Sequence, residues 1–426
     1  MTIFIFLASL LGAMALGMPL AFSLLVSGVA LMLHLDSFDT QIVSQNLING
    51  ADNFPLMAVP FFMLAGELMN AGGMSRRIVN SAMVWVGHFQ GGLGYVAVFA
   101  AIIMASLSGS AVADTAALAA VLMPMMRKAG YRMDRSAGLI AAGGIIAPVI
   151  PPSIGFILFG VIGGVSISKL FMAGIFPGIL MGLALIVTWW IVARNDNVQV
   201  SPRVPMAEKL KVTANAFWSY LLAVTIIGGM KMGVFTPTEA AVVAVVYALF
   251  VGLFIYREIQ FKDLYQLVLN AAKTSSIVMF LVAAALVSAW LITVANIPAQ
   301  VVAMMEPFID NKMLLMALLM LLVMIVGTAL DFAPTVLILT PVLMPLVRQA
   351  GIDPVYFGVL FIINNAIGLL TPPVGTVLNV VCGVGRIPMH EVIKGVWPFL
   401  LSQLVVMSLL IIFPQLVMAP LRWMIS

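Results

Sequence analysis

Residues 122–130 read LMPMMRKAG and residues 343–351 read LMPLVRQAG, so a proline-interrupted apolar segment occurs twice, 221 residues apart. Other positions keep the same offset: Pro151-Pro152 with Pro372-Pro373, Gly164 with Gly385, Gly174 with Gly395, and Pro177 with Pro398. Broken hydrophobic segments at corresponding places in two halves are the best sequence indication of a transporter's binding site. The repeat therefore bears on function as well as on fold.

The composition indicates that lipid surrounds most of the chain. Hydrophobic residues make up 63% of the 426 residues and charged residues only 8%, whereas a soluble domain carries about 25% charged residues. The net charge of +4 is small, and no run of Lys or Arg indicates nucleic-acid binding.

Sites built on cysteine or histidine are excluded or disfavoured. Cys382 is the only cysteine, which excludes a disulfide within the chain and a cysteine-based metal site. The three histidines, His34, His88 and His390, lack metal-ligand spacing. With no acid–base–nucleophile set either, we expect neither an enzyme nor a bound cofactor.

Apolar segments long enough to enter a membrane alternate with polar loops. The expected segments are Ile3–Leu33, Pro55–Ala71, Gly92–Lys128, Ser136–Val165, Leu170–Ala193, Trp218–Met230, Glu239–Tyr256, Thr274–Val294, Met313–Val347, Tyr356–Val381 and Val396–Met418. The first lacks a basic n-region and a cleavage site, so we expect it to be a retained span. The amphipathic stretch Ser75–His88 is expected to lie along the membrane interface.

Two of these segments are too long for one crossing, which needs about 20 residues. Gly92–Lys128 has the polar centre Ser106–Ser110, and Met313–Val347 bends at Thr328–Pro334. Both are therefore expected to be re-entrant hairpins with tips inside the membrane.

Charge placement supports this topology. With a cytoplasmic N-terminus and hairpins that enter and leave on one side, 15 of the 20 Lys and Arg residues fall on the cytoplasmic side, as the positive-inside rule requires. An extra span between the halves then inverts the second half.

The expected fold is an all-α polytopic membrane protein with two inverted-topology repeats. The repeats are residues 1–193 (hairpin about 91–129, broken helix about 136–165) and 236–426 (hairpin about 312–349, broken helix about 355–381), joined by a linker loop and extra span at 194–235.

Two tips and two broken helices at membrane depth leave free backbone groups, which are tolerated where protein or a cavity satisfies them. Unwound carbonyls and helix C-terminal ends suit a small hard cation such as sodium, which prefers oxygen ligands. The candidate oxygens near tips and breaks belong to Ser106, Ser108, Ser110, Ser153, Asp331, Thr335, Thr371, Thr376 and Asn379.

Each candidate also has a structural interpretation. Membrane serines and threonines often only bond to backbone carbonyls. Asp331 favours function, because a carboxylate at membrane depth is costly. Asp114 could serve either purpose, and the amides of Asn364 and Asn365 could bond helices together or contact substrate. Glu239 is expected to be a helix cap after Thr236.

Five motifs together resemble the large membrane subunit of TRAP transporters, the DctM family. They are AGELMNAGGMSRRI (65–78), SLSGSAVAD (106–114), GGIIAPVIPPS (143–153), FTPTEAA (235–241) and GLLTPPVG (368–375). The resemblance covers essentially the whole chain. It implies a sodium-driven, ATP-independent importer of organic acids in the bacterial inner membrane, with a periplasmic substrate-binding protein as partner. It also implies a small four-helix membrane subunit, expected as a separate chain because this one begins directly with its first span.

The resemblance further implies an elevator mechanism, with hairpins and broken helices as a transport domain and the other spans as a scaffold. Family sodium sites match Ser106–Ser110 with Ala147–Ser153, and Thr328–Thr335 with Thr371–Thr376. The implied sodium residues are Ser106, Ser108, Gly109, Ser110, Pro148, Pro151, Ser153, Thr328, Asp331, Thr335, Thr371, Pro372, Gly375 and Thr376. The candidate substrate residues are Asp114, Ser153, Asn364, Asn365 and Asn379.

Among family members the chain looks closest to those handling sugar-derived carboxylates such as 2,3-diketo-L-gulonate, and more distant from sialic-acid members; dicarboxylates are a further candidate class. Two other classes remain open. One is a stand-alone ion-coupled organic-anion transporter that needs no binding protein. The other is a polytopic membrane enzyme or a channel, although a channel would not need two matched closed tips.

Overall fold

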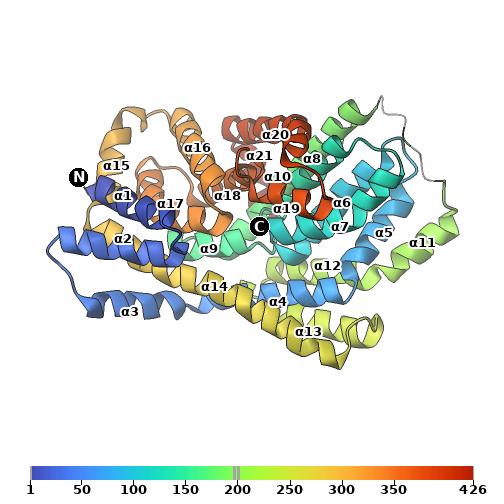
Figure 1. Ribbon diagram of the computed structural model, residues 1–426, viewed down its shortest axis with the longest axis horizontal. Helices are drawn as coiled ribbons and strands as arrows, with labels where there is room; N and C mark the ends of the chain where they lie inside the picture. Colours follow the sequence, from blue (N-terminus) through green and yellow to red (C-terminus); the bar gives the residue numbers. More distant parts are fainter. Residues whose placement is uncertain (1, 195–197, 199–201, 426) are drawn as a thin grey trace.

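The computed structural model describes residues 2–194, 198 and 202–425, and within them every regular element is helical (Figure 1). Six helices are long and apolar enough to cross a membrane, or seven if the bent pair α11 (Met206–Asn215) and α12 (Phe217–Lys231) forms one span. The expectation of an all-α polytopic membrane protein is confirmed.

The N-terminal segment is two helices instead of the one span expected over Ile3–Leu33. α1 (Thr2–Ala15) and α2 (Leu20–His34) pack against each other. The chain reverses at Gly17, whose φ is +82°, just before Pro19. At 1.5 Å per residue each helix is about 21–23 Å long, less than the ~30 Å hydrocarbon core. The apolar run concealed this turn.

A layer that we call the frame runs along the lower side of Figure 1. It contains α1, α2, α3 (Thr40–Ala51), η1 (Phe54–Met57), α4 (Ala58–Ala71), α13 (Pro237–Phe250) with its π-helical continuation η2 (Val251–Ile255), and α14 (Phe261–Val294). α4 packs on α13 and α14, and α14 also packs on α2 and α3. The expected cap is present, since Thr236 and Glu239 form a capping box at the start of α13. α14 begins 13 residues before the expected Thr274, and α3 was not expected.

The first hairpin follows the frame through one short helix. The order is α5 (Met74–Val86), α6 (Gly92–Ser108), α7 (Ala111–Lys128), α8 (Met133–Gly144), α9 (Ile154–Gly163) and α10 (Ile167–Ala193). α5 matches the stretch expected at the interface. A break at cis Pro151-Pro152 separates α8 from α9.

Between the halves, α11 and α12 meet at an angle of 57°. Helix α11 was not expected, because the sequence there is polar. Part of the expected linker, residues 195–197 and 199–201, lies outside the described residues.

The second half follows the same order after α14. It comprises α15 (Ile297–Met305), η3 (Glu306–Phe308), α16 (Lys312–Ala329), α17 (Phe332–Gln349), α18 (Pro354–Leu370), α19 (Thr376–Gly385), α20 (Met389–Ile412) and α21 (Gln415–Ile425). The expected last span, Val396–Met418, is wrong at both ends: α20 begins earlier and ends before Pro414, and α21 is a separate helix. A second cis Pro-Pro bond, Pro372-Pro373, separates α18 from α19.

The two halves interlock reciprocally. α7 packs on α19, and α17 packs on α9. At the end of α7, Arg127 Nη2 donates to the carbonyl of Gly385 at 2.8 Å. At the end of α17, Arg348 Nη2 donates to the carbonyl of Gly163, also at 2.8 Å. Arg127 and Arg348 correspond in the 221-residue repeat, and their acceptors differ by one position, since Gly385 corresponds to Gly164. The sequence repeat therefore reappears as a closely similar contact.

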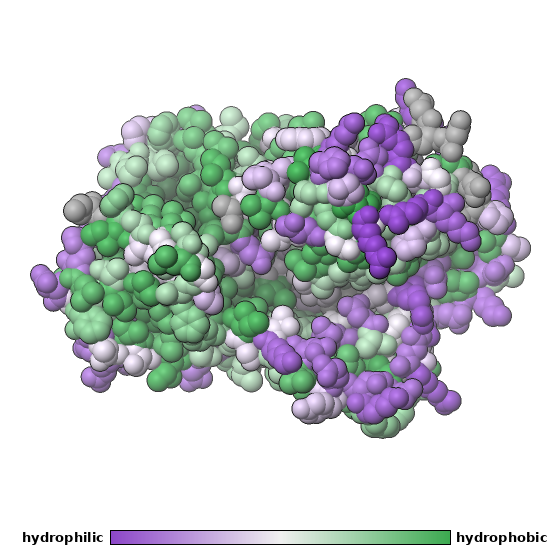
Figure 2. Space-filling model, viewed as in Figure 1, coloured by the Kyte–Doolittle hydropathy of each residue, from purple (hydrophilic) through white to green (hydrophobic). Residues whose placement is uncertain are grey.

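The surface carries the apolar stripes that lipid contact requires. Leu183, Val187 and Trp190, spaced on one face of α10, are each more than half exposed. Figure 2 shows hydrophobic residues over the left of the molecule and hydrophilic residues gathered on the right. Exposed large hydrophobic side chains on this scale mark a surface that faces membrane or another protein.

Candidate ion and substrate site

The tip of the first hairpin closes on the first broken helix. α6 ends at Ser108, Gly109 adopts a left-handed conformation with φ +63°, and Ser110 is the N-cap of α7. A Cβ atom added to Gly109 would lie 2.3 Å from the carbonyl oxygen of Pro152 and 3.2 Å from Cα of Ser153. The structure therefore brings the two expected halves of the first site into contact.

The first break is buried and internally bonded. Ser153 is the N-cap of α9: its Oγ donates to the carbonyl of Pro148 at 2.5 Å and accepts from the backbone N–H of Phe156 at 3.2 Å. Pro151 and Pro152 are also buried. This segment is a rigid turn against which the tip can seat.

Behind the tip lies a buried carboxylate. Ser108 Oγ donates to Asp114 Oδ1 at 2.5 Å, and the N–H of Ser110 donates to Ser108 Oγ at 3.2 Å. Asp114 is 2% exposed, and within the described residues its Oδ2 has no hydrogen-bond partner. The hydroxyl oxygen of Thr115, also buried, lacks a partner there too. Unpaired buried oxygens are unusual, and a cation is one group that satisfies them.

Thr115 was not identified from the sequence. The sequence offered one indication of a role for Thr115, its position next to Asp114 on the second arm of the hairpin, α7. Ser106 behaves differently, because its Oγ donates to the carbonyl of Ile103 at 2.6 Å within α6. Of the three tip serines, Ser106 alone has the simple back-bond that membrane serines often make.

The second tip turns on Asp331, the N-cap of α17. Its Oδ1 accepts from the N–H of Phe332 at 2.8 Å, and the carboxylate is exposed. Thr335 Oγ1 donates to the carbonyl of Asp331 at 3.0 Å, and Thr328 Oγ1 donates to that of Ile325 at 2.7 Å. Asp331 thus combines a capping role with a free carboxylate oxygen at the mouth of this tip.

Helix α18 holds the second hairpin. Asn364 Nδ2 donates to the carbonyl of Met320 on α16, and Asn365 Nδ2 donates to that of Phe332 at 2.9 Å. A Cβ atom on Gly368 would lie 2.9 Å from the carbonyl carbon of Gly327, so the two helices touch backbone to backbone. Both amides bond helices together, while Asn365 Oδ1 is buried without a partner in the described part of the chain.

The second break is more open than the first. Thr371 Oγ1 donates to the carbonyl of Ile367 at 2.8 Å, and Asn379 Nδ2 donates to that of Val374 at 2.9 Å. Pro373 and Val374 are exposed. The buried hydroxyl of Thr376, just after left-handed Gly375 (φ +38°), has no partner among the described residues. The second tip contacts α18 at Asn365 and Gly368, before Thr371, and not the break itself.

The ring of Phe332, at the second tip, contacts the helix that follows the first break. A Cβ atom on Gly155, in the first turn of α9, would lie 2.5 Å from Cε1 of Phe332. The second tip therefore rests on the helix that leaves the first break. In the described residues no group of three or more His, Cys, Asp and Glu side chains could hold a metal. The tips and breaks present hydroxyl, amide and carbonyl oxygens together with the carboxylates of Asp114 and Asp331, and oxygen ligands of this kind fit a hard cation.

Comparison with known proteins identifies relatives along the full chain. Residues 7–416 match the family described as "Tripartite ATP-independent periplasmic transporter, DctM component". The 2,3-diketo-L-gulonate TRAP transporter large permease protein of Escherichia coli (strain K12) is 57% identical, covering 99% of this chain and all of that protein. The sialic acid TRAP transporter large permease protein of Vibrio cholerae is 38% identical over 95% of each chain. The C4-dicarboxylate TRAP transporter large permease protein of Pseudomonas aeruginosa is 34% identical over 94% of each.

Among solved structures, the YdaH transporter of Alcanivorax borkumensis superposes with a TM-score of 0.65 over 90% of each chain. Its sequence identity of 14% means that this likeness concerns the fold alone.

Proposed function

Since this chain belongs to the DctM family of tripartite ATP-independent periplasmic transporters, we propose that it is the permease of a sodium-driven importer of organic acids. It acts as a multi-pass protein of the bacterial inner membrane and as a transporter subunit, not an enzyme. The observation that carries the sodium proposal is the closure of the Gly109 tip on Pro152, with unpaired oxygens of Asp114 and Thr115 behind it.

Sodium occupies two related sites in this proposal. The first lies between the Ser108–Ser110 tip and the break that ends at Ser153. The second lies between the Asp331 tip and the break at Thr371–Thr376. Carbonyl and hydroxyl oxygens at unwound backbone supply the ligands, as in other transporters with discontinuous helices. Substrate binds between the two sites, near Asp114 and Asn365.

The substrate is proposed to be a sugar-derived carboxylate of the 2,3-diketo-L-gulonate class. The support is the 57% identity with the E. coli permease for that acid, against 38% and 34% with the sialic acid and dicarboxylate permeases. A periplasmic binding protein delivers the substrate, and a small four-helix membrane subunit braces the frame.

Movement follows an elevator scheme in this proposal. The hairpins and broken helices are tied together by the reciprocal packing of α7 on α19 and α17 on α9. Each hairpin is entered from a frame helix through a connecting helix: α4 leads through α5 to α6, and α14 leads through α15 and η3 to α16. These connecting helices let one body carry its cargo past the frame between two inverted states.

The test is reconstitution of both membrane subunits in liposomes with an inward sodium gradient and no ATP. We expect uptake of 2,3-diketo-L-gulonate when binding protein loaded with it is outside, and loss of uptake when potassium replaces sodium. Excess sialic acid or succinate should not compete. Equal uptake without the binding protein would instead establish a stand-alone ion-coupled transporter, and a requirement for ATP would contradict both.

A further inference from the structure

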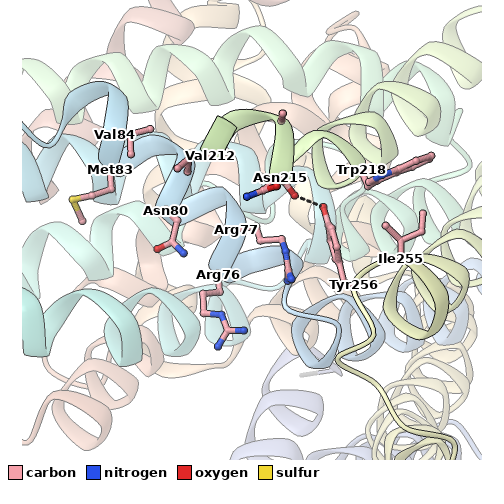
Figure 3. A pocket seen from close by; sticks show the side chains of 11 residues that line it. Arg76, Arg77, Asn80, Met83, Val84, Val212, Asn215, Trp218, Ile255 and Tyr256 are labelled. Carbon is pink, nitrogen blue, oxygen red and sulfur yellow. Dashed lines mark hydrogen bonds between the residues drawn. The ribbon is translucent and has the colours of Figure 1, made fainter. Parts of the chain in front are cut away.

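A basic cavity lies away from the tips, at the ends of the frame helices. Its volume is about 780 Å³. The lining residues are Arg76, Arg77, Asn80, Met83, Val84, Val212, Ala214, Asn215, Trp218, Ile255 and Tyr256 (Figure 3). They come from α5, from α11 and α12, and from η2 with the residue that follows it. α4 ends just before the cavity, α12 begins there, and α13 with η2 ends there. Two candidate spans end there, and the bend between α11 and α12 lies beside them, so we place the cavity at the membrane surface.

One side of the cavity is positively charged. Arg76 Nη2 lies 2.8 Å from Glu258 Oε2, and Arg77 Nη1 lies 2.6 Å from Glu258 Oε1. Two guanidinium groups therefore share a single carboxylate, which leaves one positive charge. Arg77 stacks on Tyr256, with its Cζ 3.8 Å from the ring centroid. Asn80, one turn along α5, adds an amide donor beside them (Figure 3).

Helix α11, which packs on α5, carries Lys209 and Lys211 with one acidic residue, Glu208, so its net charge is also positive. Lys209 Nζ lies 5.3 Å from the centroid of the Trp85 ring, and Lys211 is exposed nearby in sequence. Trp85 Nε1 donates to Thr213 Oγ1 at 2.9 Å, which fixes α11 against α5. The field at the mouth therefore favours an anion.

Apolar side chains flank the basic residues of the cavity at both ends. Met83 and Val84 on α5 face Trp218 and Ile255 across it (Figure 3). Beyond Ile255, the rings of Phe250 and Phe254 are each more than half exposed, on the surface that lipid must cover. Basic side chains beside apolar ones at the membrane surface complement a phospholipid, whose charged headgroup is joined to apolar chains.

We propose that this cavity binds an anionic phospholipid, with its phosphate at Arg76, Arg77 and Asn80 and its acyl chains along Trp218 and Ile255. Guanidinium groups bind phosphate through paired N–H donors, and basic pockets between spans are suited to anionic headgroups. Arg76 is a better residue to substitute than Arg77, because its side chain is 62% exposed and its hydrogen bond goes to the side chain of Glu258, not to the backbone. Arg77 also donates to the carbonyl of Gly73 at 3.1 Å, so its loss would disturb the α4–α5 turn.

The experiment measures lipid retained by the purified full-length chain in native mass spectrometry, and the shift of its thermal midpoint in mixed micelles. Phosphatidylglycerol is compared with phosphatidylcholine and with inorganic phosphate. The variants are R76Q and N80D, and K262Q is the matched control, since it removes one exposed charge near the start of α14 outside the cavity. One basic residue near an anionic lipid changes affinity by about fivefold.

We expect phosphatidylglycerol to be retained and to raise the thermal midpoint, with R76Q and N80D each weakening retention about fivefold and K262Q matching the unmodified chain. Retention of phosphatidylglycerol by R76Q and N80D at the level of the unmodified chain would overturn the proposal. So would equal binding of phosphatidylcholine, or an equal thermal shift with inorganic phosphate, which would indicate a small-anion site. Displacement of bound lipid by the proposed small membrane subunit would assign the cavity to a protein and overturn it as well.

Discussion

Replacing Gly109 by alanine tests whether closure of the first tip forms an ion site. The added Cβ meets the carbonyl oxygen of Pro152 at 2.3 Å, and a backbone atom cannot move aside as a flexible side chain can. The left-handed conformation costs an L-residue about 1–2 kcal/mol, and overpacking adds about 1–3 kcal/mol. Together these terms disfavour the closed tip by about 2–5 kcal/mol, or about 30-fold to several thousand-fold in population.

The matched control is Gly130→Ala. Gly130 also has a left-handed backbone, with φ +81°, but an added Cβ there meets nothing within 4 Å. This variant carries the conformational cost without the collision, in the turn between α7 and α8. Its thermal midpoint should fall slightly while transport is retained.

The assay is uptake by proteoliposomes across a series of sodium concentrations, with insertion and monodispersity checked first by chromatography. Gly109→Ala should raise the half-saturating sodium concentration at least about 30-fold, and Gly109→Val should abolish uptake. Gly130→Ala should stay within about twofold of the unmodified protein. The same sodium dependence in Gly109→Ala and Gly130→Ala would refute an ion site at the first tip.

Three further outcomes are expected. Asp331→Asn keeps an N-cap acceptor, and Asp331→Ala does not. We expect both variants to lose sodium-driven uptake, because both lose the negative charge. Normal uptake by the Asn variant would show that Asp331 only caps α17. Arg127→Gln removes a charged donor from the carbonyl of Gly385, which should lower the free energy of unfolding by about 1.5–3 kcal/mol, and an unchanged thermal midpoint would disprove that contact. Cysteines at Ala113 on α7 and Ala244 on α13 should crosslink in only one transport state and stop uptake; state-independent crosslinking with normal uptake would refute the elevator scheme.

The Pro-Pro pairs at 151–152 and 372–373 made the two breaks predictable, because proline removes a backbone donor from a helix. The other repeated prolines do not break the chain: Pro124, Pro345, Pro177 and Pro398 lie inside the continuous helices α7, α17, α10 and α20. The tips were predictable for a similar reason, since Ser106–Ser110 and Asp331 interrupt apolar runs that are too long for one crossing. Both signals are local, so they can be read from the sequence without knowledge of the rest of the fold. The contact of Gly109 with Pro152 was expected only through the family resemblance, since it joins residues 43 positions apart.

Other features could not be predicted, because they depend on neighbouring parts of the structure or carry little signal in the sequence. The turn at Gly17 was hidden in a continuous apolar run, where one glycine and Pro19 carried the only signal. The early start of α14 at Phe261 was missed because hydropathy registers only the part of a helix inside lipid. The hydrogen bonds of Asn364 and Asn365 reach other helices, and nothing in their immediate neighbourhood indicates the partner.

The paired arginine contacts have a consequence for ancestry. Each half of the chain carries one donor and one acceptor: Arg127 and Gly163 in the first, Arg348 and Gly385 in the second. Such reciprocity is the property of an isologous interface, in which the same patch on two subunits meets itself. A chain of half this length would thus hold both parts of the contact and would meet them again on a second copy of itself. Duplication followed by fusion of such a homodimer would give a chain in which the two arginine contacts face each other across the halves, as they do here.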